Sequence, residues 1–525
     1  MRPAALVAND ANGTYYGLLT LCQLVKKKMI QGMDVFDYPA YPCRSGLFVC
    51  DTEPPIKLND KLLNIIKDFS KHRINYLQLR THDWIALDNP DVVKEILKIK
   101  AYAEKFHIKI IPYLQCYGHS KAFLWRDLRT GHTKTIKDEK VILEDEPVVL
   151  KHKNLIITED LPVIVRNGNN EELVENRDYK IIPGTIKTVW KHPKEVRYGW
   201  AKAYICSDNE PFKIQRINGG AIKHGQNVLV SYDIATGSEG YCPLSKHMHE
   251  IFKQAITRTV ELLKPEYFNL GMDEIWEIRG QGRCCANKFA TDAQAMEYEV
   301  NRATEVVKQI APDTKVMIFG DMFDENQTPA WKTFDGSNLI SQRRLSHEAI
   351  MMPWYYGTSI TTVDSIQQSS MLFLENGYEI VGTCGNRPES VFLWGQFLLT
   401  RKDRFNIAGL TYTLWASSKK YPGELGYAAY VQNSWSPSRM YLYNTGKLRT
   451  ILDSIGITDS STAEGIKKLA GEFSSPSWLN TIKELQPESE QEVKDAFRAV
   501  PPDAFNLKSY AIVPDQAKQL LQCLE

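Results

Sequence analysis

Eight short apolar runs, rich in β-branched and aromatic residues, recur along the sequence and constrain its fold more than any other feature. They cover residues 45–52, 74–81, 108–115, 267–274, 315–321, 350–357, 378–384 and 408–415. Helical patterns, with apolar residues at three- and four-residue spacing, separate several of them, at 58–72, 89–106, 244–264 and 293–310. Short continuous apolar strands are typical of a parallel sheet that is buried on both faces. Eight of them alternating with helices predict an α/β fold, a (β/α)8 barrel.

The domain organisation follows from where this alternation holds and where it fails. We expect the barrel to occupy residues 39–420, and an open doubly wound sheet is the alternative. The barrel is favoured because no glycine-rich phosphate loop follows the first strand. Residues 141–235 show two-residue alternation without helical patterns, which predicts a small inserted β module after the third strand. That module either covers the barrel or shapes one side of its cleft, and residues 421–525 are expected to form a helical tail without a site.

Charge and composition exclude several classes of partner. The chain has 64 basic and 63 acidic residues, so no basic excess indicates nucleic-acid binding. No run approaches the length of a membrane span, and the first residues make a poor signal peptide. The ten cysteines show no CxxC spacing, which predicts structural thiols, no metal site and a reducing, cytoplasmic compartment.

Polar and aromatic residues follow nearly every predicted strand, at the end where barrels of this type carry their sites. In chain order these strand-end residues are Asp51, Arg80, His82, Asp83, Trp84, Gln115, His119, Asp273, Glu274, Asp321, Trp354, Tyr355, Tyr356, Asn386, Arg387 and Trp415. Sugar rings stack their apolar faces on aromatic side chains, and their hydroxyls take polar partners. The sequence therefore predicts a carbohydrate partner, with no cofactor.

The fourth predicted strand ends on two adjacent carboxylates, Asp273 and Glu274, in the stretch YFNLGMDEIW. Like charges that close repel each other, and partial burial raises the cost. Strand geometry sends neighbouring side chains to opposite faces. Both acids can therefore reach one pocket only if the strand bends as it ends.

The stretch NLGMDE, residues 269–274, resembles the Asp-Glu signature of the family 20 glycoside hydrolases, the β-N-acetylhexosaminidases. Three further segments match that family in order: RSGLFVCDT resembles its first strand, IPYLQCYGHS its third strand with the following Gly-His, and GLTYTLWAS its last strand. Residues 13–25 resemble the end of the α/β domain that precedes the family's barrel, so residues 1–38 are expected to be a remnant of that domain. The resemblance implies a divergent member, near the hexosaminidase D-like subgroup.

The resemblance implies hydrolysis of terminal, non-reducing β-linked N-acetylhexosamine with retention. The family is an exception among retaining glycosidases because the substrate assists its own cleavage. The 2-acetamido oxygen of the sugar attacks the anomeric carbon. Glu274 would be the general acid/base, and Asp273 would accept the acetamido N–H. An ionised Asp273 would help to keep Glu274 protonated near neutral pH.

Further roles are implied for residues at the same mouth. Arg44 would grip sugar hydroxyls, Trp415 would form the stacking floor, and Trp354 would add a second wall. Either Tyr355 or Tyr356 would polarise the acetamido carbonyl, and the sequence leaves both open. The remaining candidates are His119, Asp83 and Asp321.

Two positions depart from the family pattern. Asn269 stands where family members usually carry His, and Ser417 stands where many carry a Glu that grips a distal hydroxyl. A non-catalytic carbohydrate-binding relative is therefore one alternative. Another is a barrel glycosidase with a direct carboxylate nucleophile about 5 Å from the acid, for which Asp321 and Asp51 are the candidates. The preference between GlcNAc and GalNAc stays open.

Overall fold

The computed structural model describes much of the chain up to residue 414 and a short piece beyond it. The described residues are 6–24, 37–50, 55–189, 204–205, 208–237, 240–275, 277–285, 288–324, 326–327, 340, 343–356, 360–385, 388–414 and 434–435. The predicted helical tail at 421–525 thus lies almost wholly outside them. None of the described helices combines the length and the apolar character that a membrane crossing requires.

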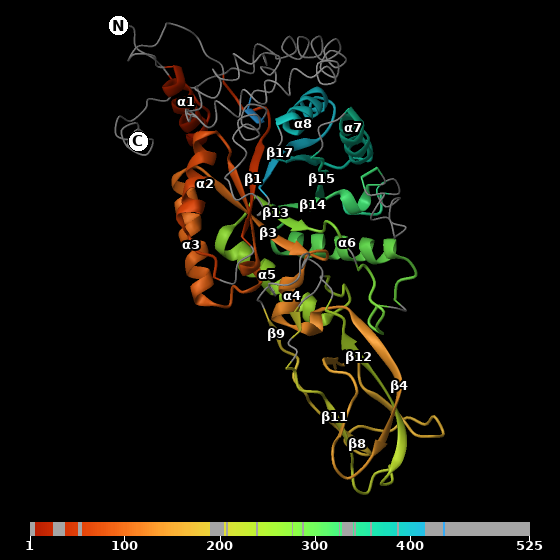
Figure 1. Ribbon diagram of the computed structural model, residues 1–525. Coiled ribbons are helices and arrows are strands. Elements are labelled where there is room, and N and C mark those ends of the chain that lie inside the picture. The colour runs from red at the N-terminus through yellow and green to blue at the C-terminus, as the bar shows by residue number, and fades with distance from the viewer. Residues whose placement is uncertain are drawn as a thin grey trace, which may run out of the picture.

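Eight parallel strands close into a barrel, so the predicted (β/α)8 fold is confirmed (Figure 1). In chain order they are β1 (Cys43–Cys50), β2 (Tyr76–Thr81), β3 (Lys109–Cys116), β13 (Tyr267–Gly271), β14 (Lys315–Phe319), β15 (Ala349–Met352), β16 (Ile380–Cys384) and β17 (Ile407–Leu414). The last strand, β17, pairs with β1 and closes the ring. All eight correspond to the runs that the sequence singled out.

The four predicted helices are confirmed to within two residues at either end. They are α2 (Asp60–Lys71), α3 (Pro90–Lys105), α5 (Lys246–Leu263) and α6 (Asp292–Ile310), and α7 (Ile360–Glu375) and α8 (Pro388–Arg401) follow the next two strands. Side-chain caps fix their starts. Asn59 accepts the N–H of Leu62, and Thr291 and Gln294 form a reciprocal capping box.

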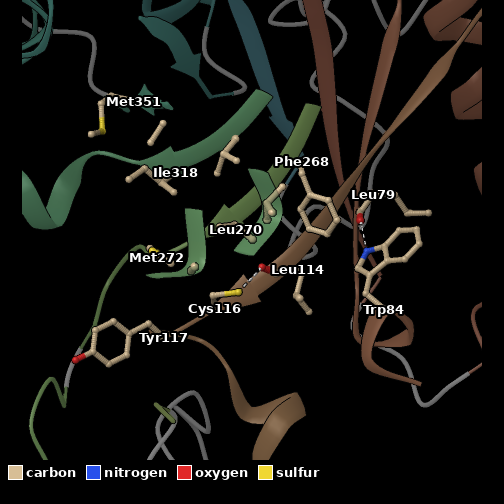
Figure 2. Packing of buried hydrophobic residues seen from close by; sticks show 14 of the residues in the cluster. Leu79, Trp84, Leu114, Cys116, Tyr117, Phe268, Leu270, Met272, Ile318 and Met351 are labelled. Carbon is tan, nitrogen blue, oxygen red and sulfur yellow. Dashed lines mark hydrogen bonds between the residues drawn. The ribbon is translucent and has the colours of Figure 1, made fainter. Parts of the chain in front are cut away.

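The outward faces of the strands pack against helices and neighbouring loops in one large hydrophobic cluster, part of which appears in Figure 2. The inward faces hold a second, apolar cluster and a buried polar network. Gln78 donates to Ser45 Oγ (2.9 Å) and Thr411 Oγ1 (2.9 Å), and Asn269 Nδ2 donates to Gln78 Oε1 (2.8 Å). Because each of these buried polar groups has a partner, the network links four strands without an unpaired desolvated group.

A β-rich segment lies between β3 and β13 and extends away from the barrel (Figure 1). Its two long strands, β4 (Thr133–Leu143) and β12 (Gln226–Ala235), pair antiparallel with a register shift near Val230. The shorter strands are β5 (Val148–Val149), β6 (Leu155–Ile156), β7 (Ile164–Arg166), β8 (Tyr179–Ile182), β9 (Thr188–Val189), β10 (Tyr204–Ile205) and β11 (Lys213–Arg216). The segment has a hydrophobic cluster of its own.

Candidate active site

The chain bends sharply where β13 ends. Gly271, Met272 and Glu274 all have left-handed φ angles, of 70°, 68° and 48°. Glycine adopts this conformation freely, whereas Met272 and Glu274 do so at a cost that the surroundings must offset. The strand therefore stops at Gly271 and not at residue 274. This is the bend that two adjacent acids need in order to face one site.

Asp273 is the more buried of the two acids, with 7% of its surface exposed. Its Oδ1 accepts a hydrogen bond from Gln115 Nε2 at 2.6 Å. Gln115 is the next-to-last residue of β3 and is itself buried. From the sequence it is placed among the strand-end residues but not among the predicted site residues. The alternation of Ile111, Tyr113 and Gln115 into the lumen is the signal that could have identified it.

Glu274 faces His119 on the loop after β3. His119 Nε2 lies 3.1 Å from Glu274 Oε2, and one oxygen or nitrogen atom from each of His119, Asp273 and Glu274 lies within 4.8 Å of the others. Gly118 makes this approach possible, because a Cβ there would lie 2.1 Å from the Asp273 carbonyl oxygen. The structure therefore brings together the two predicted acids and the predicted histidine.

A third carboxyl, that of Asp321, contacts the backbone of Glu274. Its Oδ2 accepts the Glu274 backbone N–H at 2.9 Å, and its Oδ1 accepts Trp354 Nε1–H at 3.2 Å. Burial, followed by the charge of Asp273, raises the pKa of Asp321 to about 8. This shift favours the protonated form of Asp321, whose two oxygens fix the Glu274 backbone and the Trp354 indole.

Trp354 and Tyr356 form an aromatic wall beside these carboxyls. Their rings stack with centroids 5.1 Å apart at an interplanar angle of 23°. Trp354 follows β15 and packs against the inward-facing apolar cluster. Both side chains are half-buried, so part of each surface remains accessible to a ligand.

The prediction for Arg44 is wrong. Arg44 is the second residue of β1, at the strand's amino end, whereas Asp273 follows the carboxyl end of β13. Its neighbours Cys43 and Ser45 face the lumen, so strand alternation turns Arg44 outward. Its guanidinium donates to the carbonyl oxygens of Arg73 (2.7 Å) and Tyr41 (2.8 Å). It therefore has a structural role far from the acids.

Two other predicted substrate-binding residues are also structural. Asp83 is fully buried in a 3-10 helix (His82–Ile85), where it accepts from Ile56 N–H (3.0 Å) and from the Thr81 hydroxyl. Tyr355 turns its hydroxyl towards Ser369 Oγ, 2.6 Å away on α7. Of the two tyrosines that the sequence leaves open, Tyr356 is the one whose ring stacks on Trp354.

Some strand-end residues cannot be placed. These are Trp415, Asp51, Asn386 and Arg387, which lie outside the described residues.

Trp84 is completely buried, and its indole N–H donates to the Leu79 carbonyl at 3.0 Å (Figure 2). It belongs to the core and not to the mouth.

The β-rich segment borders a separate cavity of about 510 Å³. Trp125 and Arg126 line one side of it, and Ile181 and Phe212 of the β-rich segment line the other. Neither Asp273 nor Glu274 lines this cavity.

No family model matches the sequence, and no curated protein matches it either. Among solved structures, the chain is similar to the chitobiase of Flavobacterium johnsoniae, with 15% identity over 87% of this chain and a TM-score of 0.45. That match covers 57% of the chitobiase, so this chain spans little more than half of it. It is also similar to the family 20 β-N-acetylhexosaminidase of Streptomyces coelicolor, at 12% identity over 85% of this chain and 78% of that one, with a TM-score of 0.45. A mutant Streptomyces plicatus β-hexosaminidase, in complex with the product GlcNAc, matches at 13% identity over 86% of this chain and 78% of that one, with a TM-score of 0.47.

Proposed function

We propose that this chain is a glycoside hydrolase that releases terminal, non-reducing β-linked N-acetylhexosamine (GlcNAc or GalNAc) with retention. One observation carries the proposal. Asp273 and Glu274 are adjacent in sequence, yet a left-handed turn directs both to one site, where each has its own polar partner. Adjacent acids on a regular strand would diverge, so the strained turn has a use if both act on one substrate.

Asp273 suits the role of holding the acetamido group. The Gln115 amide fixes one carboxylate oxygen at 2.6 Å, and little of the side chain is exposed. In this role Asp273 accepts the acetamido N–H and stabilises the positive charge that develops as the acetamido oxygen attacks the anomeric carbon. A low-dielectric position strengthens that electrostatic contribution.

Glu274 suits the role of proton donor because its side chain is more accessible, at 29% exposure. It gives its proton to the leaving glycosidic oxygen while the C–O bond breaks and the acetamido oxygen bonds to the anomeric carbon. It then takes a proton from the water that opens the oxazolinium ring, which restores its acid form. His119, 3.1 Å away, is the positioning residue for this carboxyl.

Asp321 does not suit the role of a direct nucleophile. It is fully buried, and both of its oxygens accept hydrogen bonds, from Glu274 N–H and Trp354 Nε1–H. A nucleophilic carboxylate needs an oxygen free to attack the sugar. The other candidate, Asp51, lies outside the described residues. This geometry favours substrate assistance, with the wall of Trp354 and Tyr356 against the sugar.

The test compares two aryl glycosides that differ only at carbon 2, a β-N-acetylglucosaminide and a β-glucoside. Substrate assistance predicts turnover of the first and none of the second, because the glucoside lacks the internal nucleophile. Comparable kcat/KM values for both would contradict it and favour a direct nucleophile. Binding of N-acetylglucosamine without turnover of either glycoside would indicate a carbohydrate-binding protein, and the galacto epimer would report the GlcNAc or GalNAc preference.

A further inference from the structure

Three thiols and one imidazole converge away from the candidate active site. Cys242 Sγ lies 3.0 Å from Cys285 Sγ and 3.3 Å from Cys284 Sγ. A ring nitrogen of His132 lies within 4.8 Å of the sulfurs of both Cys242 and Cys285. His132, Cys242 and Cys285 are each at most 1% exposed. The four side chains come from the residue just before β4, the connection between β12 and α5, and the loop after β13.

The imidazole of His132 is arranged as a ligand. Its Nε2 lies 3.1 Å from the Glu277 carbonyl oxygen, which can only accept, so Nε2 carries the proton and donates it. The lone pair is then on Nδ1, which has no hydrogen-bond partner within the described part of the chain. A buried acceptor left unpaired is costly. Histidines that bind metals commonly donate their second ring N–H to a carbonyl in this way.

The sulfur separations do not fit a disulfide. A disulfide bond measures about 2.05 Å, whereas two thiolates on one tetrahedral zinc, each at about 2.3 Å, lie about 3.8 Å apart. The observed separations fall between these values.

We propose that His132, Cys242, Cys284 and Cys285 form a structural zinc site with three thiolates and one imidazole. Thiolate and imidazole ligands select zinc among common divalent ions, and four protein ligands leave no open position for catalysis. Loading requires the sulfurs to spread to tetrahedral spacing, and the three thiols lose their protons to solvent as they bind. The prediction of no metal site came from local spacing, and the long sequence separation of these ligands explains why spacing gave no signal.

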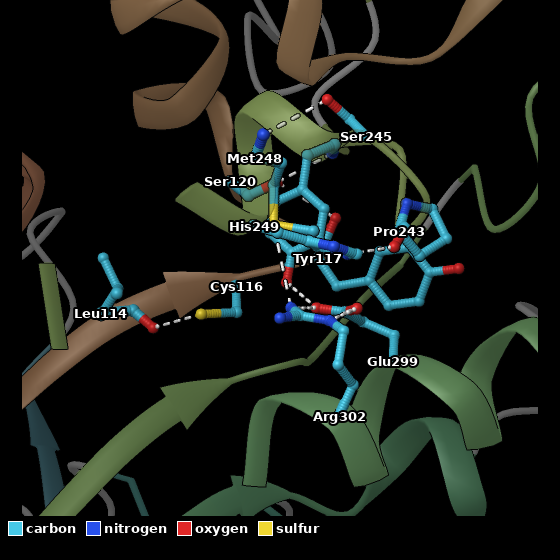
Figure 3. Close-up of polar contacts among 11 residues, drawn as sticks. Leu114, Cys116, Tyr117, Ser120, Pro243, Ser245, Met248, His249, Glu299 and Arg302 are labelled. Carbon is cyan, nitrogen blue, oxygen red and sulfur yellow. Dashed lines mark hydrogen bonds and ion pairs between the residues drawn. The ribbon is translucent and has the colours of Figure 1, made fainter. Parts of the chain in front are cut away.

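The position of the site gives it a mechanical role. It ties the loop after Glu274 to the base of the β-rich segment and to the connection that enters α5. Neighbouring contacts support the same junction: Tyr117 donates to the Ile278 carbonyl (2.6 Å), and Tyr241 N–H donates to Ser120 Oγ (3.0 Å). The ion pair of the buried Glu299 with the half-buried Arg302 lies beside this connection (Figure 3). The zinc proposal does not depend on whether the chain is a glycosidase.

The test measures metal content and cobalt spectra on the full chain, purified with a reductant and without chelator. We expect one zinc per chain. Replacement by Co²⁺ should give an intense thiolate-to-cobalt charge-transfer band and the visible ligand-field bands of a tetrahedral site. Cys285→Ser and His132→Gln should bind less metal, and Cys22→Ser, at an exposed thiol on α1 (Ala11–Leu24), should behave as the wild type.

Three results would overturn the proposal. The first is a wild-type chain that takes up no stoichiometric zinc and gives no thiolate–cobalt band, a measurement that needs no variant to fold. The second is a disulfide between Cys242 and Cys284 or Cys285, mapped by mass spectrometry in protein kept under reductant. The third is metal content in Cys285→Ser equal to that of Cys22→Ser. None of these readouts uses glycoside hydrolysis, so the two proposals can fail separately.

Discussion

At the scale of single residues, Asp321 makes the clearest prediction about pH. An unfolded Asp titrates near pH 4, at about 3.9, whereas burial raises the pKa of Asp321 in the fold to about 8. Between these values the folded chain binds a proton that the unfolded chain does not. The free energy of unfolding must therefore fall as pH rises through this window. Asp321→Asn removes this titrating group. The melting temperature of the variant, relative to that of the wild type, should therefore increase as pH rises.

Thermal melts of wild type and Asp321→Asn between about pH 5 and about pH 9 check this expectation. Asp364→Asn, at an exposed acid on α7, is the control and should follow the wild type at every pH. If the wild-type and Asp321→Asn curves run parallel across the range, the buried carboxyl does not hold its proton.

His119 makes a second prediction at this scale, on the catalytic step. Because its ring nitrogen lies 3.1 Å from Glu274, His119→Ala should lower kcat by about 10- to 100-fold and leave KM nearly unchanged. His119→Gln keeps a hydrogen-bonding group at the position and should recover part of the loss. The pH profile of kcat should shift in the alanine variant, since the partner of the acid is gone. An unchanged profile with an equal loss in both variants would indicate packing alone.

Single residues also show how far sequence reasoning reaches. The proximity of Asp273, Glu274 and His119 could be predicted because each follows a strand in a barrel whose strand order is recognisable. Arg44 was misassigned, since one residue of register decides whether a side chain faces the lumen or the outside. Gln115 was passed over because its importance depends on a partner 158 residues away.

At the scale of elements, the approach of the β3 loop to the β13 loop depends on Gly118. A methyl group there would lie 2.1 Å from the Asp273 carbonyl oxygen, so the two loops must separate to admit it. Gly118→Ala should lower kcat/KM on an N-acetylglucosaminide by about 100-fold or more, because a displacement of about 1 Å can cost that much. Gly168→Ala is the matched control, since a Cβ at residue 168 meets nothing within 4 Å. Equal activity in both variants would show that the loops do not need this contact.

The amino end of β1 provides the complementary prediction. Arg44 donates two buried hydrogen bonds to backbone carbonyls, so Arg44→Met should lower the free energy of unfolding by about 1–3 kcal/mol. The folded variant should keep the wild-type KM. Denaturant melts and steady-state kinetics on the same preparation separate the two effects. A raised KM with unchanged stability would instead indicate that Arg44 binds the substrate.

Elements were predictable where their signal is local. Helical periodicity gave α2, α3, α5 and α6 to within two residues, because amphipathic spacing and caps act over a few positions. The end of β13 was placed three residues too late, at Glu274. The left-handed angles of Gly271 and Met272 stop the strand, and the apolar pattern of that stretch carries no sign of them.

At the scale of the whole molecule, the closed barrel could be predicted because strand count and alternation reflect its topology directly. The contacts that gather distant segments could not. The thiols of Cys242 and Cys285 meet the imidazole of His132 only after β4, β12 and the loop after β13 have assembled. Tertiary structure creates that cluster, and no spacing rule along the chain describes it.

For the barrel as a whole, the central proposal is that it positions Glu274 to donate a proton to the leaving glycosidic oxygen. The most direct test is hydrolysis of an aryl β-N-acetylglucosaminide by wild type, by Glu274→Gln and by the control Glu277→Gln, the same change three residues further along the loop. We expect turnover by wild type and control, and a kcat/KM at least about 100-fold lower in Glu274→Gln. Turnover by Glu274→Gln at the wild-type rate would contradict the assignment of the acid and, with it, the proposed mechanism.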